Sequence, residues 1–364
     1  MIKFLDLKRQ YGLLKNEIDA AVLRVFEDGS FIKGAEVGKF EHSFAKYCEA
    51  SHCITCGNGT DGLSALLKAF DLPKNSTVIV PANTFIATAE AVVSIGLKVK
   101  FADISDDYTV SPESVESLID DSVSAVIAVH LYGQPARIDE LRKITQKRGI
   151  VLIEDAAQAH GAMLNGQKAG SLADGAVFSF YPGKVLGAAG DAGAVVLNND
   201  KIAEKVRKYC DHGRSDKYIH QFAGINSRMD TIQATVLNVK LKYLENWIDA
   251  RNEVASIYLK LIKEDCGIIL PRVRHNVRHS WHLFVIKTEK RDKLKKYLES
   301  EGIECGIHYP VSLPQQPAFI DECCYAKNYQ SLKDSKMLLS IPIGEHLRKK
   351  DVSEVSEKIN NFFE

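Results

Sequence analysis

The sequence lacks the features of several protein classes. Its 47 Lys and Arg residues are balanced by 47 Asp and Glu residues, so the formal net charge is zero and bulk charge gives no support for nucleic-acid binding. It has no uninterrupted apolar run of the ~18 residues that a membrane helix needs, and charges interrupt the short apolar start expected of a signal peptide. We therefore expect a cytoplasmic protein that binds neither nucleic acid nor a membrane.

Cysteine is present without a metal-binding pattern. Eight cysteines are spread along the chain. Cys53 and Cys56 form a CxxC, but no second CxxC completes a zinc site, and the neighbouring residues are typical of a buried strand. The sequence also has neither a Walker motif nor a GxGxxG. We expect no metal and structural thiols kept in a reducing compartment.

Alternating hydrophobic patterns dominate the first two-thirds of the 364 residues. Strand candidates alternate with helix candidates from residue 36 to residue 197, which predicts an α/β fold with a mostly parallel central sheet sandwiched by helices. A long helix is expected from near Met229 to past Trp247. We predict a large domain over residues 1–245, with an N-terminal arm, and a smaller C-terminal α+β domain over residues 246–364.

A glycine-containing turn, Gly57-Asn58-Gly59-Thr60-Asp61, stands between a predicted strand and a predicted helix. The unpaired N–H groups and the positive dipole of a helix start suit a phosphate, and the Thr60 hydroxyl can add a hydrogen bond. The alternative is an ordinary turn in which Thr60 caps the helix.

Two acidic residues end the apolar strand at 151–155. Functional groups in parallel α/β sheets gather at the carboxyl ends of strands, so Asp155 can pair with a cationic ring nitrogen of a ligand. Gln158 follows three residues later and can reach the same ligand. Locally, a carboxylate that only caps the next helix is an equal alternative.

Lys184 lies between a strand and a run of small residues. Its flanking residues at 182–183 and 185–186 are apolar or small, and such surroundings desolvate an amine and lower its pKa. A lysine of that kind is a nucleophile able to form a Schiff base with an aldehyde. Ser179 is placed to donate to a phosphate. The alternative is a solvated lysine in a glycine-rich loop.

Phe85 follows another strand end, in the string 81–85. Its ring can lie over the flat face of an aromatic cofactor. A core phenylalanine at a helix start is the alternative.

Four strings occur in order: Gly-Asn-Gly-Thr-Asp at 57–61, Pro-Ala-Asn-Thr-Phe-Ile-Ala-Thr at 81–88, Glu-Asp-Ala-Ala-Gln-Ala-His-Gly at 154–161 and Ser-Phe-Tyr-Pro-Gly-Lys at 179–184. In these the chain resembles the DegT/DnrJ/StrS family of sugar-nucleotide aminotransferases. The likeness extends from residue 4 to residue 342 and includes the strings 31–34, 224–230 and 306–310. It implies the type I fold of pyridoxal 5′-phosphate (PLP)-dependent transferases.

The resemblance assigns cofactor roles position by position. Lys184 matches the lysine that binds PLP covalently and later moves the proton. Asp155 matches the carboxylate that keeps the pyridine nitrogen protonated. Gln158 matches the side chain near the cofactor's phenolic oxygen, and Phe85 matches the aromatic residue that stacks on the cofactor ring. The phosphate cradle is matched by Gly59, Thr60, Asp61 through its backbone, and Ser179. Asn226 matches an asparagine that reaches the phosphate from the neighbouring subunit, which implies a homodimer with shared active sites.

The resemblance also implies a reaction. It points to transfer of an amino group from L-glutamate to a keto group of a nucleotide-linked sugar, for bacterial surface polysaccharide or related amino-sugar synthesis. Residues 305–317 resemble the branch that aminates carbon 3, although many members of that branch have a histidine where this chain has Pro314 or Gln315.

Substrate contacts are expected from residues in the matching strings. Lys33 and Arg228 are candidates for a diphosphate, with solvated surface charges as the alternative. His308 and Tyr309 are candidates for the sugar, with a structural loop as the alternative. Phe31 is a further candidate.

Other reactions remain open at this point. Amination at carbon 4 or of another keto sugar is one alternative, and a PLP lyase or dehydratase is another, although Lys184 disfavours the histidine-type dehydratases. A non-enzymatic regulator with this fold is the third.

Overall fold

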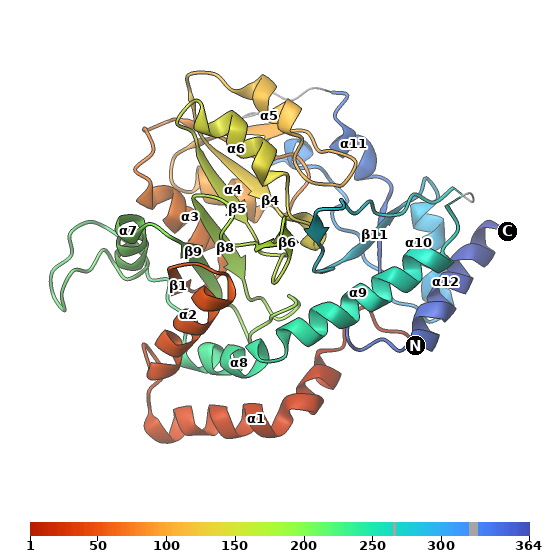
Figure 1. Cartoon of the computed structure of the whole chain (residues 1–364), viewed down its shortest axis with the longest axis horizontal. Helices are drawn as coiled ribbons and strands as arrows, with labels where there is room; N and C mark the ends of the chain where they lie inside the picture. The colour runs from red at the N-terminus through yellow and green to blue at the C-terminus, as the bar shows by residue number, and fades with distance from the viewer. Residues whose placement is uncertain (265–266, 320–326) are drawn as a thin grey trace.

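A seven-stranded sheet forms the centre of the structure (Figure 1). The computed structural model describes residues 1–264, 267–319 and 327–364. The strand order is β1-β9-β8-β5-β4-β2-β3. In chain order the strands are β1 (His52–Cys56), β2 (Thr77–Pro81), β3 (Lys98–Ala102), β4 (Val123–Val129), β5 (Val151–Asp155), β8 (Gly175–Ser179) and β9 (Gly193–Leu197). The strands from β3 to β8 in this order are parallel, and β9 is antiparallel to both β8 and β1. The expected α/β class with a mostly parallel sheet is therefore confirmed.

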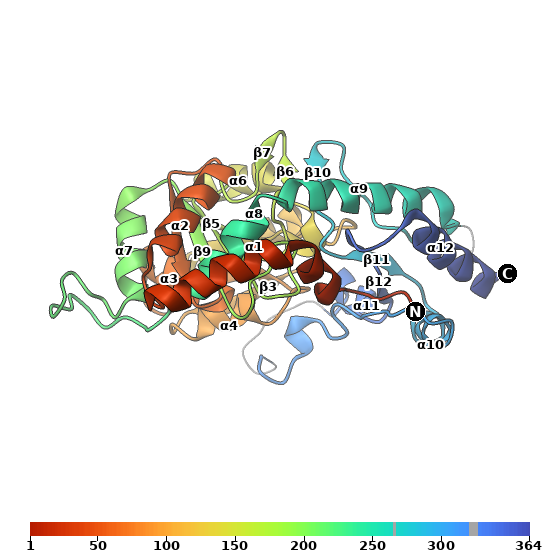
Figure 2. The ribbon, with the colours of Figure 1, turned by 90° about the horizontal axis from the view of Figure 1, so that it is seen from below.

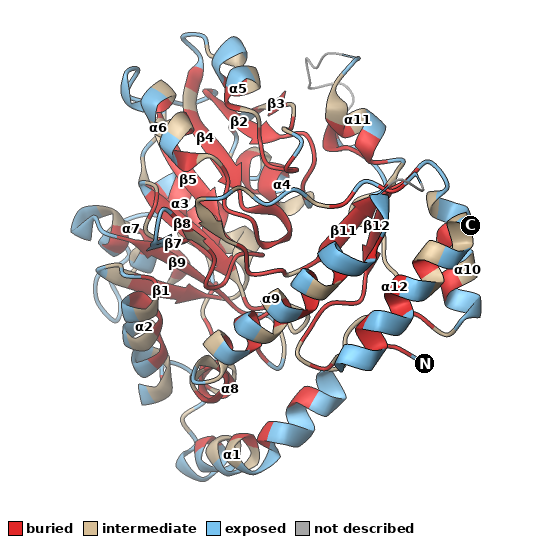
Figure 3. Ribbon diagram, turned by 45° about the vertical axis from the view of Figure 1, so that its right-hand side comes forward, coloured by how far each residue is buried: buried red, intermediate tan, exposed pale blue. Residues whose placement is uncertain are grey.

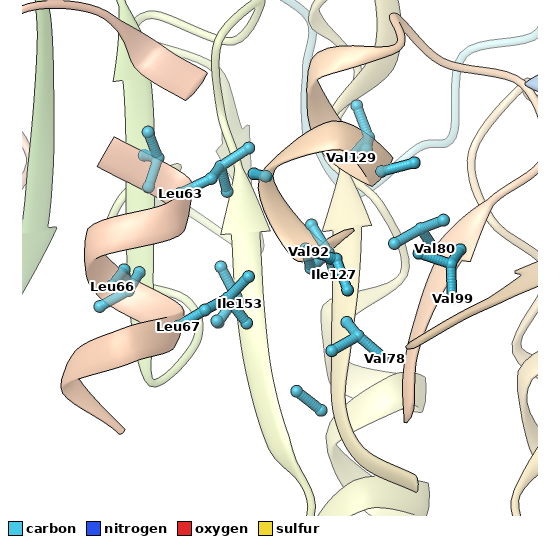
Figure 4. Packing of buried hydrophobic residues seen from close by; sticks show 14 of the residues in the cluster. Leu63, Leu66, Leu67, Val78, Val80, Val92, Val99, Ile127, Val129 and Ile153 are labelled. Atoms are coloured by element: carbon cyan, nitrogen blue, oxygen red, sulfur yellow. The ribbon is translucent and has the colours of Figure 1, made fainter. Parts of the chain in front are cut away.

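Helices cover both faces of this sheet. On one face Leu63, Leu66 and Leu67 of α3 pack beside Ile153 of β5 (Figure 4). Side chains alternate along a strand, so Val126 of β4 belongs to the core on the opposite face. The helices in the two layers are α2 (Ala35–Tyr47), α3 (Gly59–Ala69), α4 (Ala87–Val93), α5 (Pro112–Leu118), α6 (Ile138–Gln146), α7 (Asp200–Cys210) and α8 (Thr231–Leu241). Burial on both faces explains why the central strands are almost continuously apolar.

A second, smaller core lies toward the C-terminus. Strands β11 (Phe284–Lys287) and β12 (Leu338–Ile341) form an antiparallel pair. Helices α9 (Leu244–Leu261), α10 (Arg291–Ser300) and α12 (Lys349–Phe363) pack around that pair, with their outer faces exposed (Figure 3). The division at residue 245 stays a prediction, and α9 begins one residue before it.

Short elements connect these layers. They are η1 (Leu131–Gly133), β6 (Met163–Leu164), β7 (Gln167–Lys168), β10 (Val277–Arg278), η3 (Leu313–Gln315) and α11 (Gln330–Asp334). The three shortest strands form a sheet of their own in the order β10-β6-β7.

Two features at the edge of the large sheet differ from the prediction. The single helix expected from Met229 past Trp247 is two helices, α8 and α9, which are separated at Lys242 and Tyr243. The N-terminal arm contains a 22-residue helix, α1 (Leu7–Asp28), which lies along α8 (Figure 2). Tyr243 donates a hydrogen bond from its hydroxyl to Glu17 of α1. A residue at the break between α8 and α9 therefore also binds α1.

Among the described residues, no helix combines the length and the apolar character required to cross a bilayer.

Candidate active site

A cavity of about 620 Å³ lies where β5 and β8 end and α3 begins. Its size is typical of a small-molecule site. Nine of the predicted site residues line it: Gly59, Thr60, Phe85, Asp155, Gln158, Ser179, Lys184, His308 and Tyr309. The predicted residues that do not line it are Phe31, Lys33, Asp61, Asn226 and Arg228.

Lys184 is presented by a turn that follows β8. Its N–H donates to Tyr181 O at 2.8 Å, and Gly187 allows the next turn to close, because a Cβ there would lie 2.3 Å from Pro182 O. Burial lowers the pKa of Lys184 to about 8, and the charge of Asp155 opposes that shift. The predicted desolvation of this amine is therefore present, and a larger neutral fraction makes it a better nucleophile at neutral pH.

Asp155 turns toward the cavity at the end of β5. Its Oδ2 accepts from Thr88 Oγ1 at 2.8 Å and its Oδ1 accepts from Ala157 N at 3.1 Å. Both donors hold the carboxylate in one orientation. Thr88 was not among the predicted site residues, although it is the last residue of the string 81–88.

Glu154 precedes Asp155 in the strand and does not line this cavity. It is fully buried, and its carboxylate accepts from the N–H groups of Gly170, Leu172 and Ala173 at 2.8–2.9 Å. The acidic pair at 154–155 thus separates into a structural carboxylate and one that faces the cavity.

His130 completes the environment of Glu154. Its Nδ1 accepts from Ala136 N at 2.9 Å, so the ring proton is on Nε2, which lies 2.9 Å from Glu154 Oε2. The histidine therefore acts as a fourth donor to the buried carboxylate.

Gln158 joins two loops across the cavity. Its Oε1 accepts from Tyr132 N at 2.7 Å and its Nε2 donates to Tyr309 Oη at 3.0 Å. Tyr132 donates its own hydroxyl to the carbonyl of His308. Burial raises the pKa of Tyr309, so its hydroxyl keeps its proton at neutral pH.

The start of α3 forms a tight cradle against β8. A Cβ on Gly59 would lie 3.1 Å from Ser179 Cβ, and a Cβ on Gly193 would lie 2.4 Å from the carbonyl carbon of Asn58. Glycine is therefore needed where these segments meet. The first N–H groups of a helix have no intrahelical acceptor, and those of Gly59 and Thr60 suit an anion.

The residue that caps α3 differs from the one expected in the capping interpretation. Asn58, not Thr60, caps α3, because its Oδ1 accepts from Asp61 N at 2.8 Å. The backbone N–H expected to bind phosphate at Asp61 is therefore already engaged. The Asp61 carboxylate accepts from Ser227 Oγ at 2.6 Å and supports the turn.

Phe85 is not a core residue. Its side chain is 55% exposed, and its ring centroid lies 5.8 Å from that of Tyr309 at a tilt of 40°. An aromatic ring this exposed at a cavity leaves a face available for a ligand.

Lys33 and Arg228 lie at a second cavity of about 820 Å³. Both pair with Asp211, and the Arg228 Nη1 to Asp211 Oδ1 distance is 3.2 Å. Asn226 is exposed and forms a backbone bridge with Asp211. Asp211, Asn226 and Arg228 belong to the segment between α7 and α8, which includes a loop that projects away from the C-terminus (Figure 1).

Phe31 lies outside the first cavity as well. Its side chain is 42% exposed, and its ring packs edge-on against Phe26 at 5.5 Å.

Several residues that line the first cavity were not predicted from the sequence. Phe4 and Leu5 come from the N-terminal arm, and Arg251 and His282 from the C-terminal part. Phe4 begins the string Phe-Leu-Asp-Leu, where the family likeness starts, so the sequence could have indicated this residue. No spacing pattern marks Arg251 or His282. Arg251 Nη1 donates to Trp281 O at 3.0 Å, so it joins segments as well as lining the cavity.

The comparisons with known proteins agree with this geometry. Residues 13–360 match the model of the DegT/DnrJ/EryC1/StrS aminotransferase family. The erythromycin biosynthesis sensory transduction protein EryC1 of Saccharopolyspora erythraea is 40% identical over 97% of each chain. The dTDP-3-amino-3,4,6-trideoxy-alpha-D-glucose transaminase of Streptomyces venezuelae is 38% identical over 100% of this chain and 96% of its own. The UDP-2-acetamido-2-deoxy-3-oxo-D-glucuronate aminotransferase of Pseudomonas aeruginosa is 36% identical over 99% and 100%.

Two solved structures are also similar. DesV of S. venezuelae, in complex with a ketimine intermediate, has a TM-score of 0.97 at 38% identity over 100% of this chain and 98% of its own. NtdA of Bacillus subtilis, with bound cofactor PMP, has a TM-score of 0.92 at 27% identity over 100% and 85%.

Proposed function

Because the chain belongs to the DegT/DnrJ/EryC1/StrS aminotransferase family and is thus a PLP-dependent aminotransferase, we propose that it aminates a nucleotide-linked keto sugar. We further propose carbon 3 as the position and L-glutamate as the donor. Relatives named for 3-amino or 3-oxo sugars, 36–38% identical to this chain, support the position. Glutamate is the donor that the family resemblance implies.

The residues that line the first cavity fit PLP. At the cradle formed by Gly59, Thr60 and Ser179, a Cβ on Gly59 would lie only 3.1 Å from Ser179 Cβ, and the start of α3 offers helix N–H groups to a phosphate. Asp155 offers a carboxylate for a protonated ring nitrogen, and the Lys184 amine has a lowered pKa. When bound, PLP supplies an aldehyde for an amine and a ring that withdraws electrons.

Lys184 is then the group that moves the proton in both halves of the reaction. Its amine would remove the proton from the donor's α-carbon and deliver it to the carbon of the cofactor's aldehyde group, and for the acceptor it would move a proton in the opposite direction. Gln158 holds Tyr309 at 3.0 Å, so the tyrosine keeps its orientation while substrates exchange. Phe85 covers one side of the site and reduces access of water.

A homodimer with shared active sites is part of this proposal. Lys33, Arg228 and Asn226 lie outside the first cavity of their own chain, and Lys33 and Arg228 line the second cavity. We assign Asn226 to the phosphate in the partner's site. Lys33 and Arg228 are assigned to the substrate's diphosphate and Phe31 to its sugar nucleotide, where remote contacts position the keto carbon.

The convergence of Lys184, Asp155 and the start of α3 on one cavity carries the proposal. The test is the visible absorption spectrum of the PLP-loaded protein before and after L-glutamate. A band that converts to the amine form of the cofactor, and is absent from Lys184→Ala, supports the donor half-reaction. Recovery of the band with a 3-keto but not a 4-keto nucleotide sugar supports the position.

Other outcomes of that experiment distinguish the alternatives. Recovery with a 4-keto sugar indicates amination at carbon 4. Consumption of an amino acid without formation of the amine cofactor indicates a lyase or dehydratase. Full biological function of Lys184→Ala indicates a regulator, a role suggested by the name of one relative. The physiological setting we propose is cytoplasmic synthesis of amino sugars for a surface polysaccharide or a related product.

A further inference from the structure

Residues 2–6 form a segment, here called the N-terminal strap, that is fastened to the C-terminal part of the chain. Ile2 O accepts from Glu304 N at 3.0 Å, and Phe4 N donates to Glu304 Oε2 at 2.9 Å. At its other end Asp6 caps α1. Both ends of the strap are thus hydrogen-bonded, which fixes the position of the side chains of the residues between the two ends.

Phe4 and His308 are stacked at the wall of the first cavity. Their ring centroids are 5.8 Å apart and their planes differ by 15°. His308 Nδ1 lies 2.8 Å from Ser340 Oγ. A Cβ on Gly306 would lie 2.6 Å from His308 Cε1 and 3.5 Å from Phe4 Cζ. Phe4 therefore packs on one face of the imidazole, Ser340 contacts Nδ1, and Gly306 lies at the Cε1 edge. Nε2 is the nitrogen that is left available to a ligand.

The strap also reaches the turn that carries Lys184. Leu5 Cδ2 would lie 3.6 Å from a Cβ on Gly183, and Leu5 lines the same cavity as Phe4. One short segment thus contacts both the loop of His308 and the loop of the reactive amine.

We propose that Phe4 is a positioning residue, which holds His308 by stacking so that Nε2 contacts the keto sugar in the second half-reaction. This inference rests on the proposed function, in which His308 contacts that sugar. Burial, with the charge of Lys184 second, lowers the pKa of His308 to about 4, so the ring is neutral at pH 7. A neutral imidazole depends on orientation for its hydrogen bond, and small misplacements of such groups reduce rates by about 100-fold.

The test compares Phe4→Ala, Phe4→Leu and Phe4→Tyr in the PLP-loaded enzyme, with Lys3→Ala as the matched control. Lys3 is on the same strap, but its side chain is 41% exposed, and among the described residues its ion pair is with Asp6. We expect Phe4→Ala and Phe4→Leu to lower kcat/KM for the keto sugar at least tenfold, with kcat affected as well as KM. The glutamate half-reaction should change less than twofold. Phe4→Tyr keeps the stacked ring and should restore most of the activity, and Lys3→Ala should match the wild type.

A second measurement does not need the sugar. Diethyl pyrocarbonate acylates neutral imidazoles, and mass spectrometry gives the rate at His308. We expect faster modification in Phe4→Ala and in Phe4→Leu, and the wild-type rate in Phe4→Tyr and Lys3→Ala. Gly306→Ala would displace the ring at its Cε1 edge and should give the same loss of the sugar half-reaction.

Two results would overturn the inference. Wild-type kcat/KM in Phe4→Leu would mean that any apolar side chain suffices and that stacking does not set the imidazole. An equal loss of both half-reactions in Phe4→Ala would mean that the strap supports the whole site. If instead the wild-type enzyme reacts with glutamate but with no keto sugar, the proposed substrate is wrong, while the modification rates still report on the hold that Phe4 has on His308.

Discussion

Thr88 Oγ1 donates a hydrogen bond of 2.8 Å to Oδ2 of Asp155, from the first turn of α4 to the end of β5. Both residues are buried, so water cannot replace the hydroxyl readily. The threonine therefore fixes the carboxylate that we assign to the cofactor's ring nitrogen, although it belongs to a different element.

We expect Thr88→Val to weaken this carboxylate's hold on the ring nitrogen. A hydrogen bond to a charged group contributes about 1.5–3 kcal/mol, so kcat/KM should fall about tenfold or more in both half-reactions, because both use the ring. Thr88→Ser retains the hydroxyl and should stay within about threefold of the wild type. Stopped-flow measurement of each half-reaction checks this, and a loss confined to the sugar half would contradict it.

The lowered pKa of Lys184 predicts a pH dependence for the capture of PLP by the apoenzyme. The neutral amine is the reactive form, so the rate should rise with pH and level off above about pH 8. At pH 7 about one tenth of such amines are neutral, against about 1 in 3,000 for an ordinary lysine.

Lys240 is the matched control for this profile, because burial lowers its pKa to about 8 as well. Its Nζ donates to Gly187 O at 2.7 Å and does not line the first cavity. Lys240→Met should therefore leave the midpoint of the profile unchanged. A midpoint near the ordinary lysine value of 10.5 in the wild type would contradict the desolvation argument.

Glu154→Ala should destabilise the fold more than it alters the chemistry. The change leaves His130 and three backbone N–H groups, two of them buried, without their acceptor, and each unsatisfied buried group costs about 1–3 kcal/mol. We expect the free energy of unfolding in urea to fall by about 4 kcal/mol or more. The exposed Glu354→Ala should stay within about 0.5 kcal/mol of the wild type, and an equally small effect at Glu154 would contradict the prediction.

The proposed homodimer with shared active sites predicts complementation between two inactive variants. Lys184→Ala removes the reactive amine, and Asn226→Asp places a negative charge where we expect the partner's phosphate. In a mixed dimer one site has both substitutions and the other has neither. Equal mixing after dissociation should therefore restore about a quarter of the wild-type activity, because half of the dimers are mixed and each has one intact site. No recovery, with mixed dimers shown by mass spectrometry, would place Asn226 in its own subunit's site.

Sequence reasoning located the elements that local patterns encode. The order of strands and helices, and the place of Lys184 and Asp155 at strand ends, follow from hydrophobic periodicity and from the family strings. The break between α8 and α9 was missed because Lys242 and Tyr243 interrupt no helical spacing. The roles of Thr88 and Phe4 depend on contacts with residues 67 and 304 positions away, which no local pattern contains.

The cap of α3 shows a different reason for error. Asn58 and Thr60 are both good capping residues, and only the backbone geometry decides between them. Because Asn58 takes the N–H of Asp61, the N–H groups that we propose for the phosphate are those of Gly59 and Thr60 alone, which composition does not reveal.

The N-terminal strap has a consequence for the order in which the enzyme is made. A ribosome produces Phe4 some 300 residues before Glu304, to which the strap is fastened. At about 5–20 residues per second, the strap stays unattached for a considerable part of a minute before Glu304 has been made. The large sheet can form in that interval, so this wall of the cavity is put in place only after most of the fold around it has been synthesised.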